Sequence, residues 1–190
     1  GVESFNKRNL KLMNRSHTKK EVFEKINLCK RLGFNNINVD LIYALPEESL
    51  FTLKSDLNTM LKLGITHIST YSLIIEEHTM LYNNGTKPID ELLDFKMYKY
   101  ICRKLKKRGF HHYEVSNFAL KGYESKHNLI YWDNNEYYGF GLGAHGYINE
   151  MRYENTRNFN KYLNGQYRLN EFLVSTQEEM ENEVILGLRK

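Results

Sequence analysis

The sequence has few of the residues that build disulfide frameworks, metal clusters or membrane spans. Its 190 residues include 2 Cys and 2 Pro, and no uninterrupted apolar run approaches the ~18 residues that a transmembrane helix needs. Cys29 and Cys102 are too far apart for a CxxC-type metal site, and two cysteines do not make a disulfide scaffold. No secretion signal is visible, so the sequence predicts a protein of the reducing cytoplasm.

What is present is the composition of an ordinary folded domain. Hydrophobic residues make up 41% of the chain and charged residues 26%, and a chain of this length can bury one sizeable core. The net charge of +4 is too small to require a nucleic-acid partner. The densest basic run, residues 103–108, is best explained as the solvated end of a helix.

The two ends of the sequence predict a piece of a longer protein. The chain begins at Gly1 without a Met, and residues 1–5 have the pattern of the end of a strand. Residues 176–190 predict a helix without a C-cap. Thr176 and Glu179 have the spacing of a capping box at the start of that helix.

Three segments repeat one arrangement, in which a basic helix end is followed by a glycine and a short strand. The three glycines are Gly33, Gly64 and Gly109, and glycine readily takes the left-handed conformation that ends a helix. The strands are predicted over residues 36–43, 67–73 and 112–116. Thr18 and Glu21 predict a capping box at the start of the first helix. This alternation predicts an α/β fold with a parallel sheet, right-handed crossovers and helices on one face, hence a partial (β/α) barrel.

The first predicted strand has polar side chains on one face. Val39 and Leu41 alternate with Asn38 and Asp40, so the apolar pair should face the helices and the polar pair the barrel interior. Closed barrels fill their interior with apolar side chains, so polar ones indicate an open barrel that lines a cavity. Asp40 is therefore a candidate ligand contact, whereas Asn38 alone is explained as well by hydrogen bonds to neighbouring strands.

The second predicted strand fits the same picture. Thr70 and Ser72 lie two positions apart along it. We therefore expect both side chains to face the interior that Asp40 faces.

The sequence changes character after Phe118, where glycines and aromatic residues cluster. Residues 139–146 read Gly-Phe-Gly-Leu-Gly-Ala-His-Gly, but no Lys-Ser/Thr pair follows, so this is not a P-loop. These glycines predict close approach of the backbone to something flat or bulky. His127 precedes the large aromatics Tyr131 and Trp132, so it is a candidate ligand contact, although a structural role is equally consistent. No Ser lies in a nucleophile elbow, and no catalytic residue is predicted.

Seven short motifs occur in the order that is known from one family. They are GVESFN (1–6), NRSHT (14–18), NVDLIYALP (38–46), YSL (71–73), YEVSNFA (113–119), HNLIYW (127–132) and GLGAHG (141–146). Together they resemble the radical-SAM family of oxygen-independent coproporphyrinogen III oxidases and the haem chaperones HemW. The resemblance spans nearly the whole chain, and the ordered set is far more specific than any single motif.

The resemblance implies a fold and a cofactor. Residues 1–118 would form the C-terminal part of a radical-SAM (β/α) barrel, and residues 119–190 the start of a smaller α+β region. The family's cysteine triad for a [4Fe-4S] cluster is missing here, so the cluster and the cleavage of S-adenosylmethionine (SAM) are implied only for the full-length protein, and this piece alone is expected to be inactive. The residues at SAM-contacting positions are Glu3, Arg15, Asp40, Ile42 and Ser72.

Two of these positions have a stated chemistry. Arg15 suits the carboxylate end of SAM, and Asp40 can accept hydrogen bonds. The family usually has Gln where this chain has Glu3, and a carboxylate cannot donate a hydrogen bond as an amide does.

The resemblance also implies a function. The His-Asn-x-x-Tyr-Trp pattern at residues 127–132 is typical of the haem-chaperone branch, which makes His127 the candidate haem contact. The parent protein would then bind haem or a porphyrin and deliver haem to acceptor proteins, which could include a membrane-associated one. The alternative is the oxidase, which decarboxylates propionates of coproporphyrinogen in porphyrin biosynthesis. A third reading is an α/β domain that binds neither ligand, and an open sheet edge would allow dimerisation.

Overall fold

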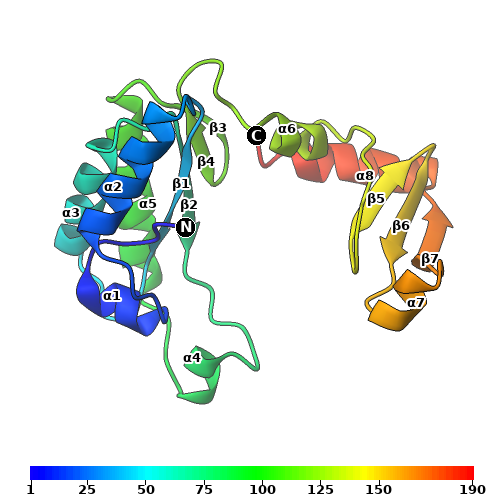
Figure 1. The fold of residues 1–190 in the computed structure, drawn as a ribbon, viewed down its shortest axis with the longest axis horizontal. Helices are drawn as coiled ribbons and strands as arrows, with labels where there is room; N and C mark the ends of the chain where they lie inside the picture. Colours follow the sequence, from blue (N-terminus) through cyan, green and yellow to red (C-terminus); the bar gives the residue numbers. More distant parts are fainter. The chain divides into compact units, whose positions relative to one another are not determined.

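The computed structural model describes all residues, 1–190, and the chain divides into two compact units, Gly1–Glu124 and Ser125–Lys190 (Figure 1). The sequence placed the division between residues 118 and 119. That point falls inside β4 (Asn117–Ala119), in which Ala119 pairs with His67 of the first unit. The chain therefore completes a strand of the first sheet before it enters the second unit.

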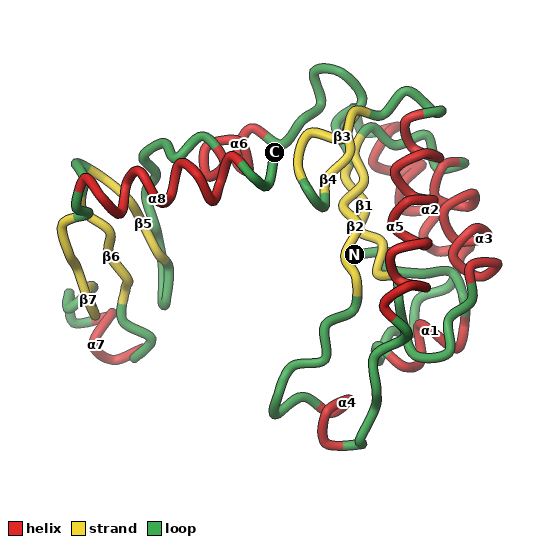
Figure 2. Tube along the Cα trace, turned by 180° about the vertical axis from the view of Figure 1, so that it is seen from behind, coloured by secondary structure: helices red, strands yellow, loops and turns green.

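The first unit is a four-stranded sheet with helices on one face. Its helices are α1 (Lys7–Leu12), α2 (Lys19–Arg31), α3 (Leu50–Leu61), α4 (Met80–Asn83) and α5 (Glu91–Lys106). Its other strands are β1 (Asn38–Tyr43), β2 (His67–Ser72) and β3 (His111–Glu114). Helices α2, α3 and α5 lie along one face of the sheet, and no helix of this unit covers the other face (Figures 1 and 2).

The strand order is β1-β2-β4-β3. β1 and β2 are parallel, as the sequence predicts, but β4 is antiparallel to both β2 and β3. The third predicted strand is therefore not the direct neighbour of the second. Only two residues, Val115 and Ser116, separate β3 from β4, so the chain returns at once and fills the position that a crossover strand would have taken.

Local sequence signals set the limits of the helices. Thr18 and Glu21 form the predicted capping box, in which each side chain bonds the backbone N–H of the other residue. Gly33, Gly64 and Gly109 follow the ends of α2, α3 and α5 with φ of +90°, +60° and +84°. This left-handed conformation is the reason why the chain turns from helix to strand at a glycine each time.

The core lies between the sheet and its helices. Val39, Leu41 and Tyr43 of β1 are buried on the helix face, as alternation along a strand requires. They meet fully buried side chains of α3 and α5, which are Leu53, Leu57, Met60, Met97, Ile101 and Leu105. The predicted apolar face of β1 is therefore confirmed.

A buried acid ties α1 to the end of β1. Glu48 is 5% exposed; its Oε1 accepts a hydrogen bond from Asn9 Nδ2 (3.1 Å) and its Oε2 one from the Leu45 N–H (3.2 Å). Burial raises the pKa of Glu48 from 4.5 to about 7, although the Leu45 bond opposes this rise. The folded chain therefore keeps this proton at a higher pH than the unfolded chain does.

The sign of this shift predicts a pH dependence of stability. A raised pKa stabilises the fold below about pH 4.5, and this contribution is lost as the pH rises through about 7. The loss amounts to up to about 3 kcal/mol, at 1.36 kcal/mol per pKa unit. In urea titrations between pH 4.5 and 7.5, Glu48→Gln should remove this part of the decline in unfolding free energy. Glu47→Gln, which changes the exposed neighbour, should show the same decline in unfolding free energy with pH as the wild type. If Glu48→Gln also shows that decline, the assignment to Glu48 is contradicted.

The second unit is a three-stranded antiparallel sheet with flanking helices. Strands β5 (His145–Ile148), β6 (Met151–Asn155) and β7 (Arg168–Leu173) lie in that order, with α6 (Lys126–Trp132), α7 (Phe159–Leu163) and α8 (Thr176–Gly187). The capping box of α8 is formed by Ser175 and Glu178, not by Thr176 and Glu179 as predicted. Ser175 has the extended backbone of an N-cap, whereas Thr176 is already helical.

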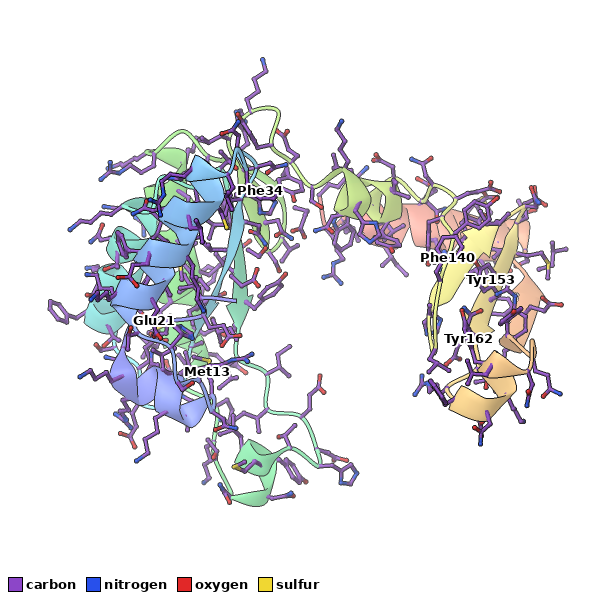
Figure 3. The ribbon with its side chains drawn as sticks, in the orientation of Figure 1. Met13, Glu21, Phe34, Phe140, Tyr153 and Tyr162 are labelled. Atoms are coloured by element: carbon purple, nitrogen blue, oxygen red, sulfur yellow. The ribbon has the colours of Figure 1, made fainter.

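The glycine-rich loop packs against a tyrosine of its own unit. A Cβ on Gly146 would lie 2.1 Å from the ring of Tyr153, and one on Gly139 would lie 2.1 Å from the carbonyl oxygen of His145. The Gly139 N–H also donates to the Tyr153 hydroxyl (2.8 Å). Figure 3 labels Tyr153 and the neighbouring Phe140. Gly146 thus approaches an internal flat group, the Tyr153 ring, whereas Gly139 approaches the backbone at His145.

Candidate functional site

One face of the first sheet carries the polar side chains that the sequence singled out. On β1, Asn38, Asp40 and Ile42 are more exposed than the residues between them, so they point away from the helices. The β1–β2 register sets His67 beside Asn38 and Ser69 beside Asp40. This surface, formed by alternate residues of β1 and β2, is called the open face below. The prediction that Asn38 and Asp40 face away from the helices is confirmed.

Ser72 does not join this face. It pairs with Tyr43, which is on the helix side, and its hydroxyl donates to Asp94 Oδ2 of α5 (2.7 Å). Thr70 pairs with Leu41 and donates to the Ser116 carbonyl (3.2 Å). The predicted interior orientation of Thr70 and Ser72 is wrong, because β2 presents its odd-numbered residues to the open face.

Sequence reasoning missed His67 and Ser69 for the same reason. Alternation along β2 shows two sets of residues, but both sets contain polar side chains. Only the pairing of His67 with Asn38 decides which set shares a face with Asp40. A one-residue change of register would exchange the two sets.

The N-terminal segment lies along the outer edge of β1. The Glu3 N–H donates to the Asp40 carbonyl (2.6 Å), and the Ile42 N–H donates to the Glu3 carbonyl (2.9 Å). Glu3 therefore extends the sheet by one parallel bridge, to Leu41. Its backbone has φ of +62°, and its side chain is nearly fully buried.

Glu3 and Arg15 form a bidentate ion pair. Arg15 Nε donates to Glu3 Oε2 and Arg15 Nη2 donates to Oε1, each at 2.6 Å. The hydrogen bonds and the charge of Glu3 raise the pKa of Arg15. The guanidinium is half-exposed, so its Nη1 edge is left for other anions. This fork geometry fixes the plane of the guanidinium.

The carboxylate of Asp40 lies next to this pair. Its Oδ1 accepts a hydrogen bond from Asn38 Nδ2 (3.0 Å). A Cβ on Gly1 would lie 3.0 Å from Asp40 Oδ2 and 3.2 Å from Glu3 Oε1. The structure therefore brings together Glu3, Arg15 and Asp40, with Ile42 next to Asp40 on the same strand face. Together the three charged groups carry one net negative charge.

A series of hydrogen bonds through His67 continues from Asn38 across the open face. His67 Nδ1 lies 2.7 Å from Asn38 Oδ1, and His67 Nε2 lies 2.6 Å from the Tyr113 hydroxyl. Burial lowers the pKa of His67, while Asp40 and Glu124 act in the opposite direction. The imidazole is thus neutral at pH 7.

The candidate haem contact lies in the second unit. His127 is an exposed residue in the first turn of α6, and its Nε2 lies 3.0 Å from the hydroxyl of Tyr131, one turn later. The ring centroids of His127 and Tyr131 are 4.8 Å apart, edge to face, and Tyr137 packs against Tyr131 at 4.4 Å. The helix spacing of four residues is what brings His127 and Tyr131 together.

The same helix carries an indole nitrogen without a partner. Trp132 Nε1 is buried and has no hydrogen-bond acceptor. The guanidinium of Arg189 lies 4.9 Å from the centre of the indole ring. This contact ties the end of the chain to α6.

Neither unit contains a preformed metal site. No group of three or more His, Cys, Asp or Glu side chains could hold a metal ion. Cys29 and Cys102 are both free thiols, and burial raises the pKa of Cys102. None of the helices combines the length and the apolar composition that crossing a membrane requires.

The fold is shared with a known radical-SAM enzyme. The chain superimposes over its whole length on 48% of the solved structure described as "Coproporphyrinogen III oxidase (HemN) from Escherichia coli is a Radical SAM enzyme", with a TM-score of 0.83 and 17% identity. The mixed α/β fold is therefore the same as that of about half of this solved structure. No family model matches the sequence.

Sequence comparison leads to a more particular group. The whole chain is 44% identical to the heme chaperone HemW of Lactococcus lactis and 40% identical to that of Bacillus subtilis, and it covers 52% of each. The resemblance found in the sequence is confirmed: the chain is similar over its whole length to proteins named heme chaperone HemW. It spans about half the length of these curated relatives.

Proposed function

We propose that this chain is part of a cytoplasmic haem chaperone built on a partial radical-SAM (β/α) barrel. The observation that carries the proposal is the 44% identity, over the whole chain, to a protein named heme chaperone HemW. The open face of the first unit would contribute to a SAM site, and α6 of the second unit would contribute a haem ligand.

The charges on the open face fit SAM. Glu3, Asp40 and Arg15 sum to one net negative charge, whereas SAM at neutral pH has a sulfonium, an ammonium and one carboxylate, and so one net positive charge. Glu3, Arg15, Asp40 and Ile42 would hold SAM, which supplies a carbon radical when a reduced [4Fe-4S] cluster cleaves it.

Two parts of the implied site need revision. Glu3 already occupies the fork of Arg15, so the carboxylate of SAM would meet only the Nη1 edge. Ser72 is left out because it bonds Asp94 on the helix side. The residues described here do not fit a [4Fe-4S] cluster, because no set of three thiols is present, and we assign this chain no part in holding one.

Haem would be cargo, bound through the imidazole of His127. A neutral histidine is a common axial ligand of haem iron, and His127 is exposed on α6 beside Tyr131. Nε2 becomes available when the Tyr131 hydroxyl turns away. The chaperone would pass haem to acceptor proteins, among them a membrane-associated one.

A haem titration tests this assignment. We expect the wild-type chain to shift the Soret band and His127→Ala to bind haem at least about tenfold more weakly, since an axial bond to iron is lost. His145→Ala, which removes another exposed histidine of the same unit, should bind as the wild type does. Equal binding by His127→Ala and the wild type would contradict the haem-ligand role.

A second candidate function is the oxygen-independent coproporphyrinogen III oxidase. The structural match to HemN favours it, because the match covers the whole chain. Turnover of coproporphyrinogen by the complete, cluster-loaded protein, without haem binding, would support the oxidase over the chaperone.

A further inference from the structure

A directional chain of hydrogen bonds ends on the carboxylate of Asp40. The chain runs from the Tyr113 hydroxyl to His67 Nε2 (2.6 Å), from His67 Nδ1 to Asn38 Oδ1 (2.7 Å), and from Asn38 Nδ2 to Asp40 Oδ1 (3.0 Å). Its members come from three strands, β3, β2 and β1. None of the first three residues belongs to the SAM set that the resemblance implies.

The charge of Asp40 determines which group donates in every bond. An ionised carboxylate only accepts, so Asn38 must turn its NH₂ group toward Asp40 and its oxygen toward His67. His67 must then carry its proton on Nδ1, which leaves Nε2 to accept from the Tyr113 hydroxyl. The Ser69 hydroxyl lies 3.0 Å from Asn38 Nδ2 and 3.3 Å from Asn38 Oδ1, so it can bond either end of the amide, and Asp40 alone sets the orientation.

The chain engages only one of the two carboxylate oxygens. Asn38 bonds Oδ1 of Asp40, whereas Oδ2 faces Gly1, where a Cβ would come within 3.0 Å. The absence of a side chain at Gly1 keeps the space beside Oδ2 open. Asp40 itself is only half-buried, so Oδ2 can meet a ligand from the open face.

We propose that Tyr113, His67 and Asn38 are positioning residues that fix Asp40 Oδ1 and thereby present Oδ2 to a hydroxyl or amino donor of the bound ligand. This inference rests on the proposed SAM site, because SAM carries donors of both kinds. The cost of orienting the carboxylate is then met during folding and not during binding, which favours affinity.

The other face of the same sheet offers a matched control. The Tyr98 hydroxyl lies 3.3 Å from His112 Nε2 and donates to the Val115 carbonyl (3.1 Å). This pair has the same chemistry as Tyr113 and His67, but Tyr98 and His112 bond each other and the Val115 carbonyl, not a carboxylate. Tyr98→Phe therefore removes a tyrosine–histidine bond without affecting Asp40.

The direction of the chain can be measured by NMR of the ¹⁵N-histidine-labelled 190-residue chain. We expect His67 in the wild type to be the neutral Nδ1–H tautomer and to keep this tautomer in Tyr113→Phe, because Asn38 Oδ1 still requires a donor, while the Nε2 signal moves because Nε2 has lost its hydrogen bond. Tyr98→Phe should leave the His67 signals unchanged. An Nε2–H tautomer in the wild type would overturn the proposed direction.

The role in binding can be measured by titrating the same variants with SAM in a calorimeter. We expect Tyr113→Phe to weaken SAM binding about 2- to 10-fold, the range for one hydrogen bond between neutral groups, while Tyr98→Phe binds normally. His67→Asn should retain affinity, because its amide NH₂ replaces the Nδ1–H donor, and His67→Leu should lose it. Equal affinity of Tyr113→Phe and the wild type, with both folded, would overturn the positioning role.

A failure of the proposed function gives a different result. If the wild type does not bind SAM, the SAM site and the ligand-presenting role of Asp40 are both refuted. The NMR measurement of the His67 tautomer does not involve SAM. It would still show whether the hydrogen bonds are donated in the direction from Tyr113 to Asp40 that is described above.

Discussion

Gly146→Ala is expected to destabilise the second unit by about 3 kcal/mol, at the upper end for overpacking of a buried contact. The added Cβ would lie 2.1 Å from the Tyr153 ring. That ring cannot simply move, because its hydroxyl accepts from the Gly139 N–H and the Arg168 guanidinium lies 3.5 Å from its centre. Urea unfolding followed by fluorescence of Trp132, the one tryptophan, reports on this unit.

Gly187→Ala is the matched control for this experiment. Gly187 lies in the last turn of α8, and an added Cβ would meet nothing within 4 Å. Alanine favours a helix over glycine by up to about 1 kcal/mol, so this variant should be neutral or slightly more stable. Equal urea midpoints for the two variants would contradict the packing of Gly146 against Tyr153.

Asp56→Ala is expected to cost about 3 kcal/mol and to release the segment that carries Glu3. Asp56 of α3 is 2% exposed and accepts a hydrogen bond from the Ser4 hydroxyl. The Ser4 hydroxyl in turn accepts from the Asn6 N–H (3.0 Å), so Asp56 anchors the segment through Ser4. Removal of this acceptor leaves the fully buried Ser4 hydroxyl without its partner, which costs about 1–3 kcal/mol.

Hydrogen exchange measures where this variant opens. The Ile42 N–H donates to the Glu3 carbonyl, so its exchange should accelerate in Asp56→Ala far more than exchange within α5. Asp56→Asn keeps an acceptor oxygen in place and should lose less stability. Unchanged protection of Ile42 in Asp56→Ala would show that the N-terminal segment is held by β1 alone.

The open face depends on this anchoring for its charge. Glu3 reaches Arg15 only while residues 1–4 lie along β1, since two backbone bonds fix its position. α3 lies on the opposite face of the sheet from the candidate site. It supports the site through the N-terminal segment, which runs along the edge of β1 and carries Glu3. A substitution in the core of α3 can thus weaken ligand binding without touching the ligand.

The sequence by itself determined the features that depend on neighbours along the chain. The capping box of Thr18 and Glu21 and the helix ends at Gly33, Gly64 and Gly109 are local, because each involves residues within one or two turns. Alternation within β1 likewise placed Asn38 and Asp40 on the face away from the helices. The ordered motifs indicated the resemblance to HemW, which the comparisons confirmed.

Only the tertiary structure decided the features that depend on which strands meet. Pairing of β1 with β2 put His67, and not Ser72, beside the polar residues of β1, because both faces of β2 carry polar groups. β4 lies between β2 and β3, and Gly146 contacts Tyr153. Neither arrangement can be predicted from a local sequence pattern, because it brings together residues from different elements. Register and packing are set by the burial of whole faces, so the residues that surround Asp40 follow from the assembled sheet.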